Sequence, residues 1–359
     1  MRAATDGDGD RAVVVGTGLI GGSIGLALRA RGWHVTGRDA DPARAQRALE
    51  LGALDAVGDD PDAHLTFVCT PVLSIPGEAR AALAAGKGLV TDVGSVKGPL
   101  AAAVADPRFV GGHPMAGSEQ EGVDGADASL FEGATWVLTP TVDTDPDAFA
   151  RIRSVVTSLG ADVVALPPER HDELVAMVSH VPHLTAATLM ALAADGAEEH
   201  AAVLRLAAGG FRDMTRVAAG SPAIWPDICA ENRDAIVGSL DRLLDALGRM
   251  RDLVASGDRD RLLVELERAR SARVNLPAKV SVPEELAEVR VPVPDRPGVL
   301  AEVTNLLGEM DVNIVDLEIA HSAEGSRGVL VMVVRRQAAE DVRAALADRG
   351  FRPSWRVLG

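Results

Sequence analysis

Short apolar runs alternate with amphipathic stretches over the first half of the chain. The apolar runs are rich in β-branched residues and are bounded by Gly, Pro or Asp, which is typical of buried strands. They span 12–15, 35–37, 65–70, 89–92, 109–111, 135–139 and 162–166, with helical patterns at 20–31, 42–51 and 147–159. Such alternation predicts crossover units on a largely parallel sheet, so we expect an α/β domain over residues 1–168.

The pattern changes after Pro167 and Pro168. Residues 169–280 contain almost no strand pattern and are predicted to form an all-helical domain. One set of apolar side chains recurs there at alternating spacings of four and three, a heptad-like seam that needs a partner helix. These are Ile236, Leu240, Leu243, Leu247, Met250 and Val254. Two interpretations remain open: the seam packs inside one helical domain, or it forms a bundle between two copies of the chain.

The C-terminal region, residues 285–359, follows a predicted linker at 276–283. Its pattern predicts strand, helix, strand, strand, helix and strand, which is the ferredoxin-like order. Pro292 and Pro294 conflict with this prediction, because they lie in a strand that the fold places centrally and proline has no N–H for the sheet. The strands are expected at 288–293, 314–321, 329–334 and 352–357, and the helices at 298–309 and 338–348.

Composition and charge limit the possible functions. The 359 residues suggest about two to three domains, and a formal charge of −16 gives no basic surface for nucleic acid or anionic membranes. An anionic substrate would therefore need a few local cations. Cys69 and Cys229 are too few for a disulfide framework, the N-terminal segment lacks a signal-peptide core, and no apolar run approaches ~20 residues. We expect a cytoplasmic protein that binds neither nucleic acid nor membranes.

A glycine-rich segment, GTGLIG, lies between the first predicted strand and helix. Gly16, Gly18 and Gly21 form a GxGxxG pattern around Leu19 and Ile20. Gly16 permits a tight turn, Gly18 lets the backbone approach a pyrophosphate, and Gly21 allows the helix to pack closely on the strand. Free N–H groups at the start of the helix favour phosphate binding. The context predicts a Rossmann-type dinucleotide-binding domain rather than an ordinary glycine turn.

Asp39 follows 18 residues after Gly21, at the end of the second predicted strand. A carboxylate there accepts hydrogen bonds from the ribose of NAD and would repel the 2′-phosphate of NADP, so NAD is favoured. The neighbouring Arg38 leaves two alternatives open, because its guanidinium could accept that phosphate or stack on the adenine ring. Asp39 could also be a simple turn residue before the next helix.

Further candidates lie at the carboxyl ends of the next strands, where ligands bind in open α/β sheets. Cys69, Thr70, Pro71 and Asp92 occupy these ends. We assign all four to the dinucleotide site.

His113 is the candidate general base. It lies in GGHPMAG, a glycine-shaped loop at the ligand edge. The pKa of an unperturbed histidine is about 6.5, so the ring can remove a hydroxyl proton at neutral pH while a hydride is abstracted. Ser95, in DVGSVK, is a hydroxyl that could orient the ring. The alternatives are a structural histidine and a serine that caps the next helix.

Two polar motifs stand out in the predicted helical domain. SHVPH contains His180 and His183, and FRDMTR contains Asp213 between Arg212 and Arg216. Two histidines without a third ligand at standard spacing do not indicate a metal site, so no metal is expected. The charged motif could also be a solvated helix face.

Taken in order, these motifs resemble the prephenate dehydrogenase family of tyrosine biosynthesis. The resemblance covers nearly the whole chain and rests on GTGLIG, DVGSVK, GGHPMAGSE, SHVPH, GGFRDMTR and PAIWPDICAEN. It implies oxidation and decarboxylation of prephenate to 4-hydroxyphenylpyruvate with NAD, in which His113 bonds the C4 hydroxyl and Ser95 orients it. The substrate site that the family implies comprises Arg216 on a carboxylate, His183 and Trp225 near the side chain, Glu119 and Asp213 beside the arginine, and Ser118.

The C-terminal region resembles an ACT domain, a module that binds small amino acids. The expected effector residues are Asp295, Gly298, Val299, Leu300, Asn313 and Ile314. The resemblance implies tyrosine as an effector, and the heptad-like seam suggests a homodimer. Three alternatives remain. An arogenate dehydrogenase would differ in substrate, another NAD-linked dehydrogenase with an ACT tail would lack SHVPH and FRDMTR, and a non-catalytic sensor would have no use for His113 and Ser95.

Overall fold

The computed structural model describes residues 9–117, 120, 122–199, 202–275, 286–294, 296–321 and 327–357. The chain divides into two compact units, Met1–Gly248 and Arg249–Gly359. The first contains the α/β domain and most of the helices that follow it, and the second contains the C-terminal sheet.

The first unit is built on an eight-stranded sheet in the order β3-β2-β1-β4-β5-β6-β7-β8. Strands β1 to β6 are parallel, and their order is the Rossmann arrangement, as predicted. The last two strands depart from the pattern, because β7 runs antiparallel to β6 and β8 is parallel to β7. The strands are β1 (Arg11–Val15), β2 (His34–Arg38), β3 (Ala56–Val57), β4 (Leu65–Val68), β5 (Leu89–Asp92), β6 (Phe109–Pro114), β7 (Thr135–Thr139) and β8 (Asp162–Ala165).

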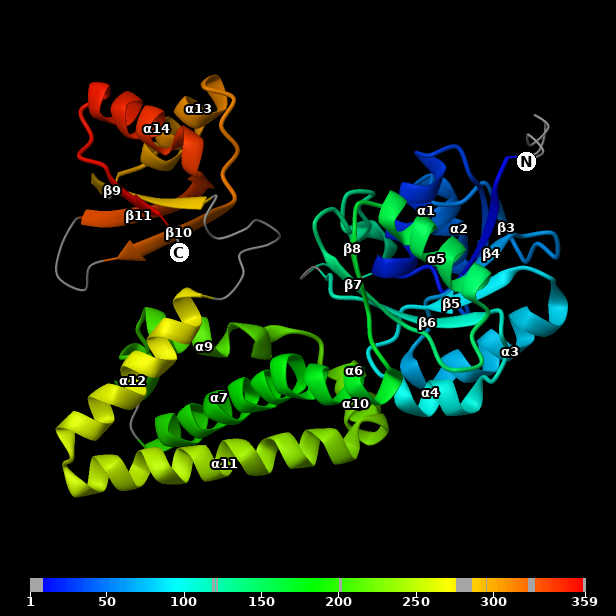
Figure 1. Ribbon diagram of the computed structural model, residues 1–359, viewed down its shortest axis with the longest axis horizontal. Coiled ribbons are helices and arrows are strands. Elements are labelled where there is room, and N and C mark those ends of the chain that lie inside the picture. The colour runs from blue at the N-terminus through cyan, green and yellow to red at the C-terminus, as the bar shows by residue number, and fades with distance from the viewer. Residues whose placement is uncertain are drawn as a thin grey trace. The chain divides into compact units, whose positions relative to one another are not determined.

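Helices cover both faces of this sheet, with α1, α2 and α5 on one side and α3 and α4 on the other (Figure 1). Apolar side chains of α1 and α5 share one core with the sheet, and those of α3 and α4 share a second. These cores leave the carboxyl ends of β1 to β6 at a common edge. The helices are α1 (Leu19–Arg29), α2 (Pro42–Glu50), α3 (Ile75–Ala85), α4 (Gly98–Ala103) and α5 (Pro146–Ser158).

The described residues between Pro168 and Val274 form helices and no strands, as the sequence predicts. Figure 1 shows α7 and α11 running alongside each other, and both line an apolar cavity of about 490 Å³. The seam on α11 begins buried at Ile236, 4% exposed, and ends at Val254, 63% exposed. The helices are α6 (Pro168–Val175), α7 (Val181–Glu199), α8 (Ala202–Arg205), α9 (Gly209–Thr215), α10 (Trp225–Glu231), α11 (Arg233–Ser256) and α12 (Arg259–Val274).

One helical stretch, Pro168–Ala197, is long and apolar enough to cross a membrane, with a mean hydropathy of 1.4. The expectation that no such run exists is wrong, because a π-helical turn at Ala176–His180 joins α6 and α7 into a continuous helix. Core helices of water-soluble proteins have the same length and composition, so a single stretch is weak evidence for a membrane span.

The C-terminal domain is an antiparallel sheet in the order β10-β11-β9-β12, with two helices packed on it. This is the predicted ferredoxin-like arrangement. Its elements are β9 (Leu286–Pro294), α13 (Val299–Glu309), β10 (Asp316–His321), β11 (Arg327–Arg335), α14 (Arg336–Asp348) and β12 (Ser354–Val357).

The two prolines of β9 are accommodated by the unequal lengths of its neighbours. Strand β11 pairs with the whole of β9, but β12 pairs only with the part from Ala287 to Arg290. Pro292 and Pro294 therefore lie where β9 has a neighbour on one side alone. A missing N–H at such a position need not break a ladder.

Candidate active site

The glycine-rich turn has the form that a dinucleotide requires. Gly16 has a φ of +94°, and a Cβ there would lie 2.6 Å from the carbonyl oxygen of Cys69. A Cβ on Gly21 would lie 1.9 Å from the carbonyl oxygen of Gly16. Gly18 caps α1 without a side chain, and the space around it is open. The first N–H groups of α1, including those of Leu19 and Ile20, are thus presented to a phosphate, and the residues fit the pyrophosphate of NAD.

Asp39 is held beside this turn. Its carboxylate accepts hydrogen bonds from Thr17 N at 2.8 Å and Asp41 N at 3.0 Å. Its Oδ2 also accepts from Thr17 Oγ1 at 3.3 Å, whereas Oδ1 has a further lone pair that can accept from a ribose hydroxyl. Asp39 therefore lies directly after β2 and beside the glycine turn, and its role as the ribose-binding acid stays a prediction.

The residues after β4 lie beside the glycine turn, whereas Asp92 at the end of β5 is buried in an ion pair. Thr70 and Pro71 follow β4 beside the glycine turn, and burial raises the pKa of the Cys69 thiol, which keeps it protonated and unreactive. Asp92 does not fit its predicted role in cofactor binding, because its side chain is fully buried. It is instead paired with Lys97.

The Asp92–Lys97 ion pair fixes the backbone around the candidate base. Lys97 Nζ donates to Asp92 and, at 2.8 Å, to the carbonyl oxygen of Gly112. Asp92 also accepts from Gly94 N at 2.8 Å and Gly112 N at 3.0 Å. Burial lowers the pKa of Lys97, and the adjacent carboxylate opposes that shift. The pair ties the segment after β5 to β6, the strand that carries His113.

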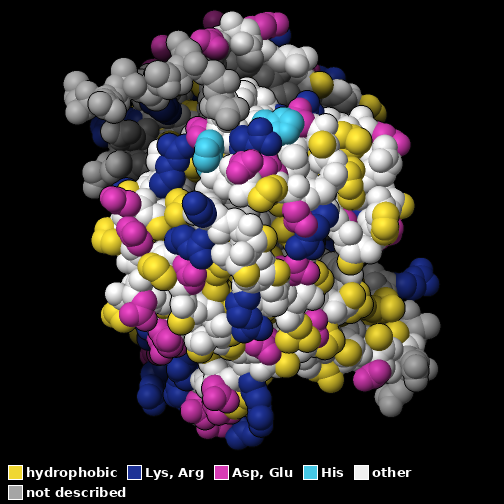
Figure 2. Space-filling model, turned by 90° about the vertical axis from the view of Figure 1, so that its right-hand side faces the viewer, with side chains coloured by type: hydrophobic (Ala, Val, Ile, Leu, Met, Phe, Trp, Pro, Cys, Tyr) yellow, Lys and Arg dark blue, Asp and Glu magenta, His cyan; other side chains and the backbone are white. Residues whose placement is uncertain are grey.

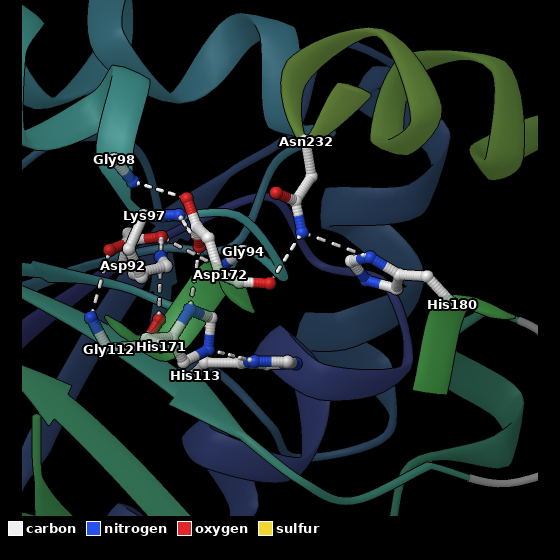
Figure 3. Close-up of polar contacts among 10 residues, drawn as sticks. All are labelled: Asp92, Gly94, Lys97, Gly98, Gly112, His113, His171, Asp172, His180 and Asn232. Atoms are coloured by element: carbon white, nitrogen blue, oxygen red, sulfur yellow. Dashed lines mark hydrogen bonds and ion pairs between the residues drawn. The ribbon is translucent and has the colours of Figure 1, made fainter. Parts of the chain in front are cut away.

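His113 lies at the start of a chain of hydrogen bonds that crosses from the sheet to α6 (Figure 3). Its Nδ1 is 2.9 Å from Nε2 of His171, and Nδ1 of His171 is 2.8 Å from Oδ1 of Asp172. The partner of the His113 ring is thus His171. Ser95, expected to orient this ring, makes no hydrogen bond to it in the described part of the chain.

The protonation of both rings follows from this chain. The carboxylate of Asp172 accepts hydrogen bonds from Lys97 N at 2.8 Å and Gly98 N at 2.7 Å, so it acts as an acceptor. His171 must then carry its proton on Nδ1, which leaves Nε2 to accept from Nδ1–H of His113. His113 consequently presents a lone pair on Nε2. A general base needs this tautomer.

The surroundings keep His113 uncharged. Burial lowers its pKa well below the usual value, and the positive charges possible on His171 and Lys97 act in the same direction. Burial likewise lowers the pKa of His180 to about 4. Both shifts favour the uncharged imidazole, so the lone pair on Nε2 of His113 is available to a hydroxyl proton.

The predicted side-chain site lies in the helical part of the first unit. The rings of His183 and Trp225 are stacked, with centroids 3.7 Å apart, and His180 meets the same indole edge-on at 6.0 Å. Asn232 joins this cluster to the base chain, because its Nδ2 is 3.2 Å from Nδ1 of His180 and donates to the carbonyl oxygen of Asp172 at 2.9 Å.

The predicted substrate arginine occupies a different environment. Arg216 begins a short 3₁₀ turn after α9, and both it and Asp213 are exposed. Ser118 and Glu119 lie outside the described residues, as does Asp295 of the predicted effector loop. The other effector positions lie near the start of α13 and before β10: Gly298 caps α13 with a φ of +87°, Val299 is buried, Leu300 and Asn313 are exposed, and Ile314 packs on the core.

Comparison with known proteins places this site in a family. The model for "Prephenate dehydrogenase, nucleotide-binding domain" matches residues 24–165, that for "Prephenate dehydrogenase, dimerization domain" matches 167–268, and that for "ACT domain" matches 287–350. The prephenate dehydrogenase of Bacillus subtilis is 35% identical over 338 residues, which cover 89% of this chain and 91% of that protein. The chain belongs to the prephenate dehydrogenase family.

Solved structures of similar enzymes agree with this assignment. The prephenate dehydrogenase of A. aeolicus, solved with hydroxyphenyl propionate and NAD+, is 28% identical with a TM-score of 0.71 and covers 76% of this chain and 100% of its own. The arogenate dehydrogenase of Synechocystis is 34% identical with a TM-score of 0.65 and covers 73% of this chain and 98% of its own. The predicted family resemblance and C-terminal ACT domain are confirmed.

Four residues that the sequence interpretation missed belong to the hydrogen-bond network around His113: Lys97, His171, Asp172 and Asn232. Each is at most 6% exposed although each is charged or polar. Buried polar residues of this kind are nearly always held by partners, and they often mark functional positions. The adjacent pair His171-Asp172 at the start of the helical region is the sequence feature that could have pointed to this network.

Proposed function

We propose that this chain is an NAD-dependent prephenate dehydrogenase that converts prephenate to 4-hydroxyphenylpyruvate. The observation that carries the proposal is the hydrogen-bonded chain Asp172–His171–His113, which ends at the edge of a sheet whose glycine turn fits a dinucleotide. Family membership supports the substrate, and the A. aeolicus relative solved with NAD+ supports the cofactor. When bound, NAD+ supplies an acceptor for the hydride from C4.

His113 performs the proton transfer in this proposal. Its Nε2 accepts the proton of the C4 hydroxyl, and the Nδ1–H bond to His171 keeps the ring oriented. The positive charge that develops on His113 faces Asp172 through His171, so the carboxylate stabilises it. Loss of the ring carboxylate as CO2 makes the ring aromatic, which drives the step.

Substrate binding falls to side chains of the helical domain. Arg216 binds a carboxylate of prephenate, which a protein with a formal charge of −16 does not attract at long range. His183 and Trp225 contact the substrate side chain, and their stacked rings form one wall. Asp213, Glu119 and Ser118 complete the mouth of the site in this proposal.

NADH formation from prephenate tests this function directly. Purified protein with NAD+ should reduce the cofactor when prephenate is added, and arogenate at the same concentration should be a poorer substrate. Faster turnover of arogenate would assign the chain to the arogenate dehydrogenases. No NADH from either substrate, in protein that still binds NAD+, would contradict the proposal.

Assembly and regulation extend the proposal. We infer a cytoplasmic homodimer in which the exposed end of the α11 seam packs against a second copy, and the match to the dimerization domain supports it. We also infer three domains that span residues 1–168, 169–280 and 285–359. We propose tyrosine as the ligand of the third, the ACT domain. The expected effector residues Gly298, Val299 and Leu300 lie at the start of α13.

A further inference from the structure

Arg38 is the cationic side chain beside the ribose-binding acid, and it is held by two carboxylates from other parts of the fold. Its Nε donates to Oδ1 of Asp59 at 2.8 Å, after β3, and its Nη2 donates to Oε2 of Glu78 at 2.5 Å, in the first turn of α3. The side chains of Arg38 and Glu78 are about one-third exposed, at 34% and 31%. The guanidinium is therefore fixed on the sheet edge while remaining accessible.

The chemistry of NADP makes this arrangement significant. NADP differs from NAD by a 2′-phosphate on the ribose that Asp39 is placed to bind, and arginine is the preferred partner of that phosphate because its planar fork binds two oxygens. In this chain the N–H groups on one edge of the fork are already donated to Asp59 and Glu78. Two carboxylates bind this one guanidinium, so the cluster carries a net negative charge.

The nearest other cations along the chain are also paired. Arg44 on α2 lies 3.8 Å from the carboxylate of Asp41, and Nη2 of Arg47 lies 2.7 Å from Asp124. Among the described residues, neither makes a hydrogen bond or an ion pair with Asp39. Asp39 repels the 2′-phosphate of NADP, but an unpaired arginine beside it would attract that phosphate and cancel the repulsion. The pairing of Arg38 with two carboxylates therefore decides the selectivity of the site.

We propose that Glu78 and Asp59 withhold Arg38 from a 2′-phosphate and thereby set the selectivity of this site for NAD over NADP. Glu78 is then a specificity-determining residue although it lies 40 positions from Arg38 and outside the glycine motif. The freed guanidinium would be a 2′-phosphate ligand. The proposal depends on the dinucleotide site and not on the identity of the oxidised substrate.

Calorimetric titration with two small probes isolates the 2′-phosphate. Adenosine 2′,5′-bisphosphate and 5′-AMP differ by that group alone, so the ratio of their dissociation constants reports on it. Glu78→Gln should improve the ratio in favour of the bisphosphate by about tenfold, the size of a charge-assisted hydrogen bond gained. Asp59→Asn should change this ratio in the same direction. The ratio of the dissociation constants of NADP+ and NAD+ should show the same trend.

A double-mutant cycle assigns the gain to Arg38. In an Arg38→Ala background, Glu78→Gln should no longer improve binding of the bisphosphate. Glu50→Gln, which removes one carboxylate paired with Arg47 at the far end of α2, is the matched charge control and should leave the ratio unchanged. The proposal is overturned if Glu78→Gln leaves the ratio unchanged in protein with an unaltered thermal transition, or if the gain persists without Arg38. Failure to oxidise prephenate would concern the proposed function alone, since these titrations need no substrate.

Discussion

The two ends of the proposed active site are built differently. At the end that accepts the proton, His113 is fixed by His171 and Asp172, and the strand that carries it is fixed by a fully buried ion pair. At the end that binds carboxylate, Arg216 is an exposed side chain at the start of a 3₁₀ turn. The proton acceptor is therefore held by hydrogen bonds within the fold, whereas the carboxylate ligand is open to solvent.

This difference matches the demands of the two tasks. Proton transfer depends on tenths of an ångström and on the correct tautomer, so a base benefits from rigid support. Binding a carboxylate through an arginine requires charge and two donors, and it tolerates more movement. Substitutions at the two ends should consequently change different kinetic constants.

The largest effect is expected at the base. His113→Asn should lower kcat by at least about 10²-fold because the general base is lost, while KM for NAD stays nearly unchanged. Steady-state kinetics with both substrates varied would measure this. Near-normal turnover of the variant would show that His113 is not the base.

A different signature is expected at the carboxylate end. Arg216→Ala should raise KM for prephenate by roughly 10- to 150-fold, the loss of a charge-assisted bond, and change KM for NAD far less. An Arg212→Ala variant, in the same motif, is the matched control. Equal increases in both KM values would indicate that Arg216 supports the fold instead.

A substitution of His171 tests whether this residue positions the His113 ring or contributes to substrate binding. His171→Gln should lower kcat by about tenfold, because the His113 ring loses the partner of Nδ1, and leave both KM values near those of the parent. Thr91→Val is the control, since it alters a fully buried side chain on β5 whose hydroxyl has no hydrogen bond among the described residues. A rise in KM without a fall in kcat would contradict the positioning role.

The smallest effect is expected in the ACT domain, which belongs to the second compact unit. Deleting residues 285–359 should leave an enzyme that oxidises prephenate but has lost part of its inhibition by tyrosine, because coupling between separate sites is typically about 1–3 kcal/mol. Inhibition curves of the two proteins at matched prephenate concentrations would measure it. Identical curves would mean that the tail does not sense tyrosine, and direct competition at the active site would survive the truncation.

Most of the fold follows from periodicity in the sequence. The predicted strand at 89–92 is β5 residue for residue, and the helix predicted at 42–51 is α2 to within one residue, because β-branched runs and helix-start signals act locally. Strand β3 was missed because Ala56 and Val57 are both exposed and carry no hydrophobic pattern. The reversed direction of β7 and β8 depends on which strand each meets, which local pattern does not encode.

The site was predictable only where it coincides with a strand end. His113, Gly16 and Asp39 lie at or directly after such ends, so the sequence pattern alone places them at this edge of the sheet. His171 was missed because 58 residues separate it from His113, and their contact exists only when α6 packs against the sheet. Asp92 was assigned to the cofactor for the same reason, since its partner Lys97 becomes visible only in the folded structure.

The chain of hydrogen bonds also bears on how the protein could be divided or recombined. Asp172 belongs to α6, in the segment that the dimerization-domain model covers, yet its carboxylate caps α4 through Lys97 N and Gly98 N. A cut at residue 168 would therefore separate the base from its support while leaving both pieces with intact cores. Chimeras between members of this family should carry α6 with the nucleotide-binding domain, because the hydrogen-bond network that supports His113 extends beyond the α/β domain into α6.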